Sequence, residues 1–204
     1  VQQASTSRRR PQSAFITDRH AQELYWDFVR EIVSRYKDHP AIFSWQLCNE
    51  PRCFSKDPEV QDQFVGMISN TAKLIKSIDG NHMVSTGNEG EMGCENNFDL
   101  CVRINRIPEI DYVNIHIWPY NWSWVRENSV NDGMEDALVK VGKYIDEHLH
   151  LAYVLRKPLV IEEFGYPRDG FSFDRGSSTA GRDAVYGYVF SRVIKSAAEI
   201  RGQK

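Results

Sequence analysis

Short apolar runs alternate with long amphipathic stretches along this chain of 204 residues, and the alternation narrows the folds that it can adopt. The short runs predict strands over 42–47, 82–86, 111–117 and 158–162. Apolar residues that recur at i, i+3, i+4 and i+7 predict helices over 17–37, 57–78, 131–155 and 181–201. Repeated strand–helix units favour an α/β fold of the (β/α)8 TIM-barrel type over separate α and β layers.

A complete barrel needs eight strands and about 250 residues. We therefore expect an incomplete barrel of about four β/α units, forming one partial domain over 1–204. Residues 1–14 are polar, carry Arg8-Arg9-Arg10 and are expected to be irregular. The first residue is Val1, which favours a processed, excised or incomplete chain, and an isolated half-barrel would leave two sheet edges open.

Composition argues against several classes of protein. With 41% hydrophobic and 12% aromatic residues, the chain can bury a sizeable core. Its net charge of -3 gives no reason to expect nucleic acid or an anionic membrane as a partner. No apolar run approaches the roughly 18 to 20 residues of a membrane helix, and the N-terminus lacks the apolar core of a signal peptide.

Four cysteines, Cys48, Cys53, Cys94 and Cys101, do not have the spacing of a zinc site, so we expect no metal. Two of them lie in 91–110, a long loop expected to hold one helical turn near 100–104. A Cys94–Cys101 disulfide and free buried thiols are both consistent with this pattern.

Two of the predicted strands end in an acid followed by a breaker residue. The run 42–47 leads into Asn49-Glu50-Pro51 and is expected to be buried on both faces, and the run 158–162 leads into Glu163. An isolated acid of this kind most often begins a solvated loop. Two acids at the C-terminal tips of parallel strands are what glycosidic bond cleavage needs, since one protonates the leaving oxygen and the other attacks the anomeric carbon.

Two further carboxylates lie near these tips. Glu89 follows the strand 82–86 and is interpreted as a substrate-loop residue, a rival to Glu50 only by position. Glu162 precedes Glu163, and strand alternation predicts that it points to the opposite face and is packed or ion-paired behind the sheet.

The third tip, after 111–117, is rich in aromatic residues: His116, Trp118, Tyr120, Trp122 and Trp124. Aromatic side chains stack on the C–H faces of sugar rings while neighbouring polar groups bind the hydroxyls. A tryptophan-rich loop can also simply pack on its own fold, and the two interpretations are compatible.

Taken in order, the motifs Asn49-Glu50-Pro51, His116-Ile117-Trp118 and Glu163-Phe164-Gly165 resemble glycoside hydrolase family 5. The surrounding stretches 45–52 and 116–124 resemble its β-mannanase branch most closely, and the likeness covers roughly residues 15 to 200. The resemblance implies a retaining double displacement, with Glu50 as the acid/base and Glu163 as the nucleophile.

The resemblance also implies roles for neighbouring residues. Asn49 would hold the sugar 2-hydroxyl, His116 would position the sugar and the acid/base, and Trp122 and Trp124 would bind substrate. Trp118 stands where the family usually has a tyrosine that bonds to the nucleophile, and an indole N–H can donate but not accept. The predicted strands would be the fourth to the seventh of the barrel, so the arginine and tryptophan that the other strands supply cannot be assigned.

The implied function is endo-hydrolysis of β-1,4-mannosidic bonds in mannan, glucomannan or galactomannan, without a cofactor. Alternatives are a β-1,4-endoglucanase of the same family, a catalytically silent carbohydrate-binding remnant and an unrelated α/β binding protein. Family members are mostly secreted, so a secreted or periplasmic location is expected. Nothing in the sequence indicates the oligomeric state.

Overall fold

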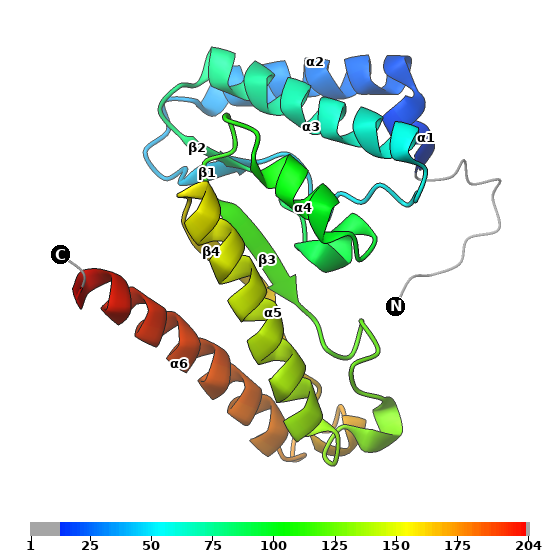
Figure 1. Cartoon of the computed structure of the whole chain (residues 1–204), viewed down its shortest axis with the longest axis vertical. Coiled ribbons are helices and arrows are strands. Elements are labelled where there is room, and N and C mark those ends of the chain that lie inside the picture. The colour runs from blue at the N-terminus through cyan, green and yellow to red at the C-terminus, as the bar shows by residue number, and fades with distance from the viewer. Residues whose placement is uncertain (1–12, 203–204) are drawn as a thin grey trace. The chain divides into compact units, whose positions relative to one another are not determined.

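The computed structural model describes residues 13–202, drawn in Figure 1 with helices and strands in alternation. These residues divide into two compact units. The first unit runs to Ile115 and includes Leu151–Val160, and the second comprises His116–His150 and the chain from Ile161 onward. Of the segment 1–14 that was expected to be irregular, residues 1–12 lie outside the described part, and Ser13 and Ala14 begin a short helix. The single domain over 1–204 stays a prediction.

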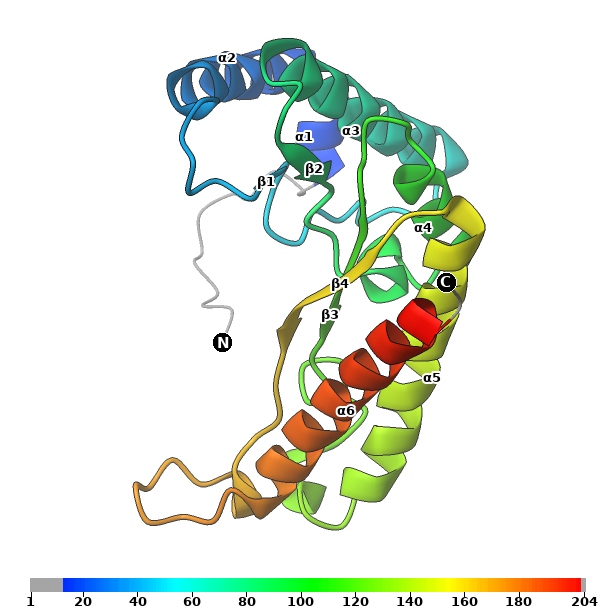
Figure 2. The same ribbon diagram turned by 90° about the vertical axis from the view of Figure 1, so that its left-hand side faces the viewer.

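The first unit places helices beside a short parallel pair of strands. Its elements are α1 (Ser13–Thr17), α2 (Arg19–Tyr36), β1 (Ser44–Gln46), α3 (Pro58–Ile78), β2 (Met83–Ser85), the 3-10 helix η1 (Glu91–Cys94) and α4 (Phe98–Asn105). Strands β1 and β2 are parallel, with Ser44 opposite Met83. Figures 1 and 2 both show α2 and α3 side by side. The inward residues of these elements form one apolar core that includes Phe64, Ile68 and Ile104.

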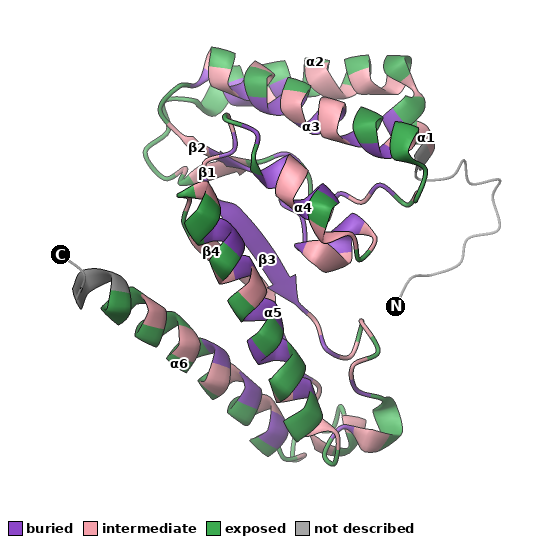
Figure 3. Cartoon of the chain, in the orientation of Figure 1, coloured by how far each residue is buried: buried purple, intermediate pink, exposed green. Residues whose placement is uncertain are grey.

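The second unit contains the C-terminal ends of two strands and two long helices. Its elements are β3 (Val113–Ile117), the 3-10 helix η2 (Glu127–Ser129), α5 (Met134–Leu155), β4 (Leu159–Phe164), the 3-10 helix η3 (Asp169–Phe171) and α6 (Ala180–Gly202). Strands β3 and β4 begin in the first unit, and α5 ends in it. Strands β3 and β4 pair with each other. Strand β3 is buried along its whole length, as Figure 3 shows. Arg192 of α6 forms an ion pair with Asp146 of α5.

The four predicted helices and four predicted strands are confirmed as elements, with differences at their ends. Helix α4 is longer than the single turn expected near 100–104, because Asn97 caps it by accepting a hydrogen bond from the Leu100 amide at 3.2 Å. Strand β4 extends through Glu163, and α5 begins at Met134, after the expected start at 131.

The prediction that the run 42–47 is a strand buried on both faces is wrong. Strand β1 spans only Ser44–Gln46, and its residues are half-buried or exposed. Within residues 13–202 its partner is β2 on one side, so no second neighbour covers it as in a continuous parallel sheet.

The four cysteines are free thiols, so the disulfide alternative for Cys94 and Cys101 is wrong. Cys53, Cys94 and Cys101 are buried, and Cys48 is exposed. Burial raises the pKa of the Cys94 thiol well above its usual value. These three buried side chains therefore behave as small apolar core residues.

In the part of the chain that the structure describes, no helix has the length and apolar character needed to cross a membrane.

A buried carboxylate at the end of α3 contacts β1 and the segment that leads into β2. The Oδ2 atom of Asp79 accepts a hydrogen bond from Trp45 Nε1 on β1 at 2.8 Å and lies 2.6 Å from His82 Nδ1. Its Oδ1 atom accepts from the backbone amides of Asn81 and His82 at 3.0 and 3.1 Å. Burial alone would raise the pKa of Asp79, but the bonds from Trp45 and His82 outweigh it and hold this pKa well below its usual range.

Because the pKa of Asp79 is lowered by folding, its stabilising effect is complete above the unfolded value of about 3.9 and is lost as the pH falls further. We expect Asp79→Asn to lower the free energy of unfolding at pH 7 by about 3 kcal/mol. The asparagine NH₂ group would replace one carboxylate oxygen and would face N–H donors that it cannot accept from. Urea unfolding of both proteins at pH 7 and below pH 4 checks this. A difference that did not shrink in acid would contradict the role of the ionised carboxylate.

Candidate active site

The proposed acid/base lies at the tip of β1, in the first unit. Glu50 is half-buried and has a left-handed backbone conformation, with φ of 50°. Its amide donates a hydrogen bond to the Gly87 carbonyl at 2.9 Å. Asn49, which precedes it, is exposed. A non-glycine residue with positive φ is uncommon and persists only where its surroundings enforce it, so this tip is held by specific contacts.

Glu89, at the tip of β2, is buried and forms a bidentate ion pair with the Arg52 guanidinium. Burial alone would lower the pKa of Arg52, but its hydrogen bonds to Glu89 and the negative charge there raise it above the usual value. The substrate-loop role predicted for Glu89 remains a prediction. In the structure its carboxylate joins two strand tips of the first unit.

The proposed nucleophile lies at the end of β4, in the second unit. The Trp118 indole N–H donates a hydrogen bond to Glu163 Oε2 at 3.1 Å, and His116 Nδ1 lies 3.4 Å from the same oxygen. His116 is buried, whereas the Glu163 side chain is 36% exposed. The structure therefore brings three sequence-predicted residues together around one accessible carboxylate.

The prediction that Glu162 is packed or ion-paired is confirmed, and its partner is His116. The face of the sheet to which its side chain points stays a prediction. Its Oε2 atom lies 3.6 Å from His116 Nε2, so the imidazole ring reaches both consecutive glutamates. Strand β3 pairs directly with β4, and the two nitrogens lie at different corners of the ring. An imidazole at the end of a strand can thus contact consecutive residues that strand alternation assigns to opposite faces.

Gly165, two residues after the nucleophile candidate, leaves room for the Trp118 ring. A Cβ atom at this position would lie 2.3 Å from Trp118 Cζ3, far inside a normal contact. A residue with a side chain here would push the indole away from Glu163. The breaker residue that marked this tip in the sequence is therefore also a steric requirement of the site.

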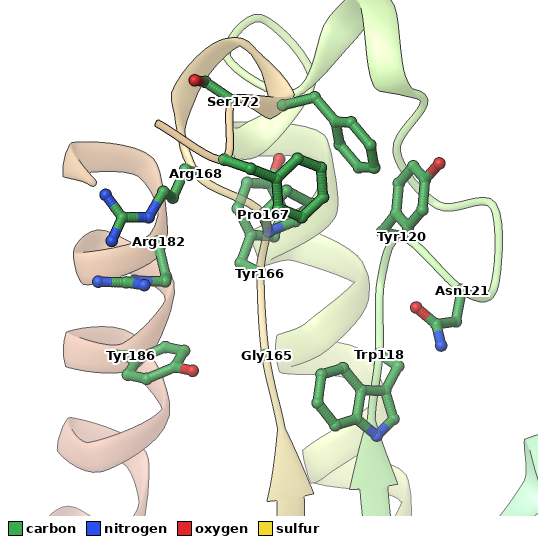
Figure 4. Close-up of a pocket in the computed structure, with 12 residues that line it drawn as sticks. Trp118, Tyr120, Asn121, Gly165, Tyr166, Pro167, Arg168, Ser172, Arg182 and Tyr186 are labelled. Carbon is green, nitrogen blue, oxygen red and sulfur yellow. The ribbon is translucent and has the colours of Figure 1, made fainter. Parts of the chain in front are cut away.

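Beside Trp118 lies an open pocket of about 370 Å³ that belongs wholly to the second unit. In Figure 4, Trp118, Tyr120 and Asn121 face it from the loop after β3, and Arg182 and Tyr186 from α6. The loop after β4 completes the wall with Gly165, Tyr166, Pro167, Arg168, Phe171, Ser172 and Phe173. Sequence reasoning missed Tyr166, Phe171 and Tyr186 as lining residues. The aromatic content of 164–173 was the available signal for the first two, and Tyr186 lies in α6, outside that stretch.

Trp122 and Trp124 do not line this pocket. They pack on Tyr144 of α5, with ring centroids 5.2 and 5.7 Å apart, and on each other at 4.9 Å. Both remain half-buried. The structure supports the interpretation of a tryptophan-rich loop packed on its own fold, and a role in binding substrate remains a prediction.

The comparison with protein families agrees with the three tip motifs. A family model described as GH family 5 beta-mannosidase-like matches residues 4–203. The chain belongs to glycoside hydrolase family 5. The family predicted from the motifs around Glu50, His116 and Glu163 is thereby confirmed.

Among its relatives in this family are two plant proteins. Mannan endo-1,4-beta-mannosidase 1 of Oryza sativa subsp. japonica is 31% identical over 90% of this chain and 45% of its own length. Mannan endo-1,4-beta-mannosidase 7 of Arabidopsis thaliana is 32% identical over 94% of this chain and 47% of its own length. The chain thus spans about half the length of the curated relatives it matches.

The fold has a close counterpart among solved structures. The glycoside hydrolase family 5 mannosidase of Rhizomucor miehei superposes with a TM-score of 0.78 at 26% identity, over 92% of this chain and 46% of that one. This likeness assigns the chain to the TIM-barrel type of α/β fold.

We expect Gly165→Ala to displace the Trp118 indole and break its hydrogen bond to Glu163, because the added methyl group cannot fit. The free energy of unfolding should fall by about 1 to 3 kcal/mol, as for other overpacked sites. The indole N–H resonance of Trp118, assigned with Trp118→Phe, should shift.

Gly176→Ala is the matched control, since nothing lies within 4 Å of a Cβ at that glycine. An unchanged Trp118 indole resonance in Gly165→Ala would show that the contact does not hold the ring.

Proposed function

We propose that this chain provides the reacting carboxylates of an endo-acting glycoside hydrolase that cleaves β-1,4-mannosidic bonds in mannan, glucomannan or galactomannan. The observation that carries the proposal is the Glu163 carboxylate, accessible at the end of β4 and contacted by Trp118 and His116, in a chain of glycoside hydrolase family 5. The plant relatives, which are named as mannan endo-1,4-beta-mannosidases, support mannan as the substrate.

In the proposed reaction Glu163 is the nucleophile of a retaining double displacement. The hydrogen bond from Trp118 fixes one carboxylate oxygen, which supports attack by the other on the anomeric carbon. The tyrosine usual at this position in the family would donate from a hydroxyl. The indole N–H supplies the same donor, so the change of residue type is compatible with this role.

Glu50 is the proposed acid/base. It protonates the leaving glycosidic oxygen while Glu163 attacks, and a covalent glycosyl–enzyme intermediate forms. Glu50 then removes a proton from water, which displaces Glu163 from the sugar with net retention. Double displacement requires the two carboxyl groups to lie about 5 to 5.5 Å apart. Asn49 is proposed to hold the 2-hydroxyl of the sugar, and His116 to orient the sugar and the reacting groups.

Trp122 and Trp124 are proposed to stack on sugar rings with the faces that their packing on Tyr144 leaves accessible, because both stay half-buried. The mechanism uses protein carboxylates only and requires no cofactor or metal. We assign the described β/α units to the fourth to seventh of the barrel, an order supported by the succession of the three tip motifs. A polysaccharide hydrolase of this kind would act outside the cell or in the periplasm.

The test is hydrolysis of mannohexaose by the chain and by Glu50→Ala and Glu163→Ala. Each substitution should lower the rate by about 10²-fold or more, since each removes a reacting group. Glu147→Ala, which alters an exposed pair with Lys143 on α5, is the control and should not change it. Residual activity near the parent level in either variant would refute the two-carboxylate assignment.

Substrate preference is tested by reducing-sugar release from mannan and from carboxymethylcellulose. Preference for mannan is expected. Faster hydrolysis of the cellulose derivative would favour a β-1,4-endoglucanase. Binding of mannohexaose without turnover would favour a silent carbohydrate-binding protein.

A further inference from the structure

The tips of β1 and β2 pair residue by residue, but in a different register from the strands themselves. Where the strands end, the Leu47 amide donates to the Ser85 carbonyl, so the number of the accepting residue is higher by 38. At the tips it is higher by 37: the Glu50 amide bonds to the Gly87 carbonyl, and Pro51 and Arg52 bond to the next two residues. The β1 side therefore contains one more residue than the β2 side between these points, with 48 and 49 opposite 86.

The extra residue lies in a bulge at 48–49, and the bulge depends on Gly87. This glycine has φ of 71°, and a Cβ atom on it would lie 1.9 Å from the Cys48 carbonyl oxygen. No side chain fits there, because the obstruction is backbone. The close approach lets the chain leave the strand at Cys48 and return at Glu50 with a left-handed conformation.

Asn88 makes the next contact between the two strand tips. Its buried side-chain amide donates to the Pro51 carbonyl at 2.7 Å, and its side-chain oxygen accepts from the Gly90 amide at 2.8 Å. Its own backbone is fixed by Thr86 Oγ1, which accepts from its amide at 3.1 Å, and by Asn114 Nδ2, which donates to its carbonyl at 2.6 Å. Asn88 thus connects the carbonyl next to Glu50 with a buried polar network.

We propose that Gly87 and Asn88 are positioning residues for Glu50, which enforce its left-handed backbone and so aim its carboxyl group. The inference rests on the proposed function, in which Glu50 is the acid/base. The contacts that carry it lie within the first unit. Neither residue touches substrate in this proposal. Their effect is transmitted through the backbone of residues 48–51.

The first test does not depend on turnover. Hydrogen exchange of the Glu50 amide, followed by NMR, should show protection in the parent because the amide is bonded to Gly87. Gly87→Ala and Asn88→Ala should each lower the protection by about tenfold or more. Lack of protection in the parent, or unchanged protection in Asn88→Ala, would overturn the proposal. Asn88→Ala decides alone if Gly87→Ala does not fold.

Two matched controls separate positioning from general loss of stability. Asn105→Ala also removes a buried amide that donates to a backbone carbonyl, that of Cys101 at 2.9 Å, but it lies on α4. At Gly80 an added Cβ meets nothing within 4 Å. Protection at Glu50 should be retained in Asn105→Ala and Gly80→Ala, and equal loss in these controls would contradict specific positioning.

The second test measures whether Asn88→Ala lowers the rate of the acid-catalysed step specifically. A dinitrophenyl leaving group departs from an aryl β-mannobioside with little protonation, so the glycosyl–enzyme forms without much help from the acid. The sugar leaving group of mannohexaose must be protonated as it departs. Asn88→Ala should lower kcat on mannohexaose by about 10- to 100-fold and the rate of dinitrophenol release in the first turnover much less. Equal loss on both substrates would contradict positioning of the acid. If Glu50→Ala leaves the parent rate unchanged, the proposed function fails, and the exchange result still decides the backbone contact.

Discussion

The hydrogen bond from the Glu50 amide to the Gly87 carbonyl is the constraint on which the first unit's strand tips depend. It closes the tip of β1 onto the tip of β2 after a bulge, so Glu50 takes a conformation that a non-glycine residue rarely adopts. The unfavourable backbone at Glu50 persists because three consecutive residues on each side are matched, through a backbone bond, a buried amide and an ion pair.

In the second unit, side-chain packing holds the Glu163 carboxylate in place. Trp118 reaches Glu163 because Gly165 has no side chain, and His116, buried on β3, reaches both glutamates of the paired strand β4. At Glu50 a backbone hydrogen bond and two side-chain contacts fix the strand tip, whereas at Glu163 the packing of Trp118 against Gly165 decides which side chains fit. Both sites contain one glycine that no larger residue can replace without movement, Gly87 beside Glu50 and Gly165 beside Glu163.

Much of this arrangement could be predicted from the sequence, because it rests on short-range signals. Apolar periodicity located the helices, and an acid after an apolar run located Glu50 and Glu163. The predicted burial of β1 on both faces was wrong, because burial depends on which strands lie beside it and the local sequence does not show its neighbours. The pairing of Glu162 with His116 was not predicted, because strand alternation says nothing of the reach of a neighbouring imidazole. Asn88 resembled an ordinary turn residue, and only the tertiary contact to Pro51 reveals its role.

The aromatic residues after β3 show how far composition can indicate function. Trp118, Trp122 and Trp124 are alike in sequence, yet Trp118 donates to a carboxylate while the other two pack on Tyr144. An aromatic ring binds a sugar only with a face that the protein leaves uncovered, since stacking needs contact over the ring plane. Packing against α5 uses part of each indole but also fixes its orientation, which lowers the entropy lost when a sugar binds. A rigid, half-covered indole is therefore better suited to hold a polysaccharide than a fully exposed one.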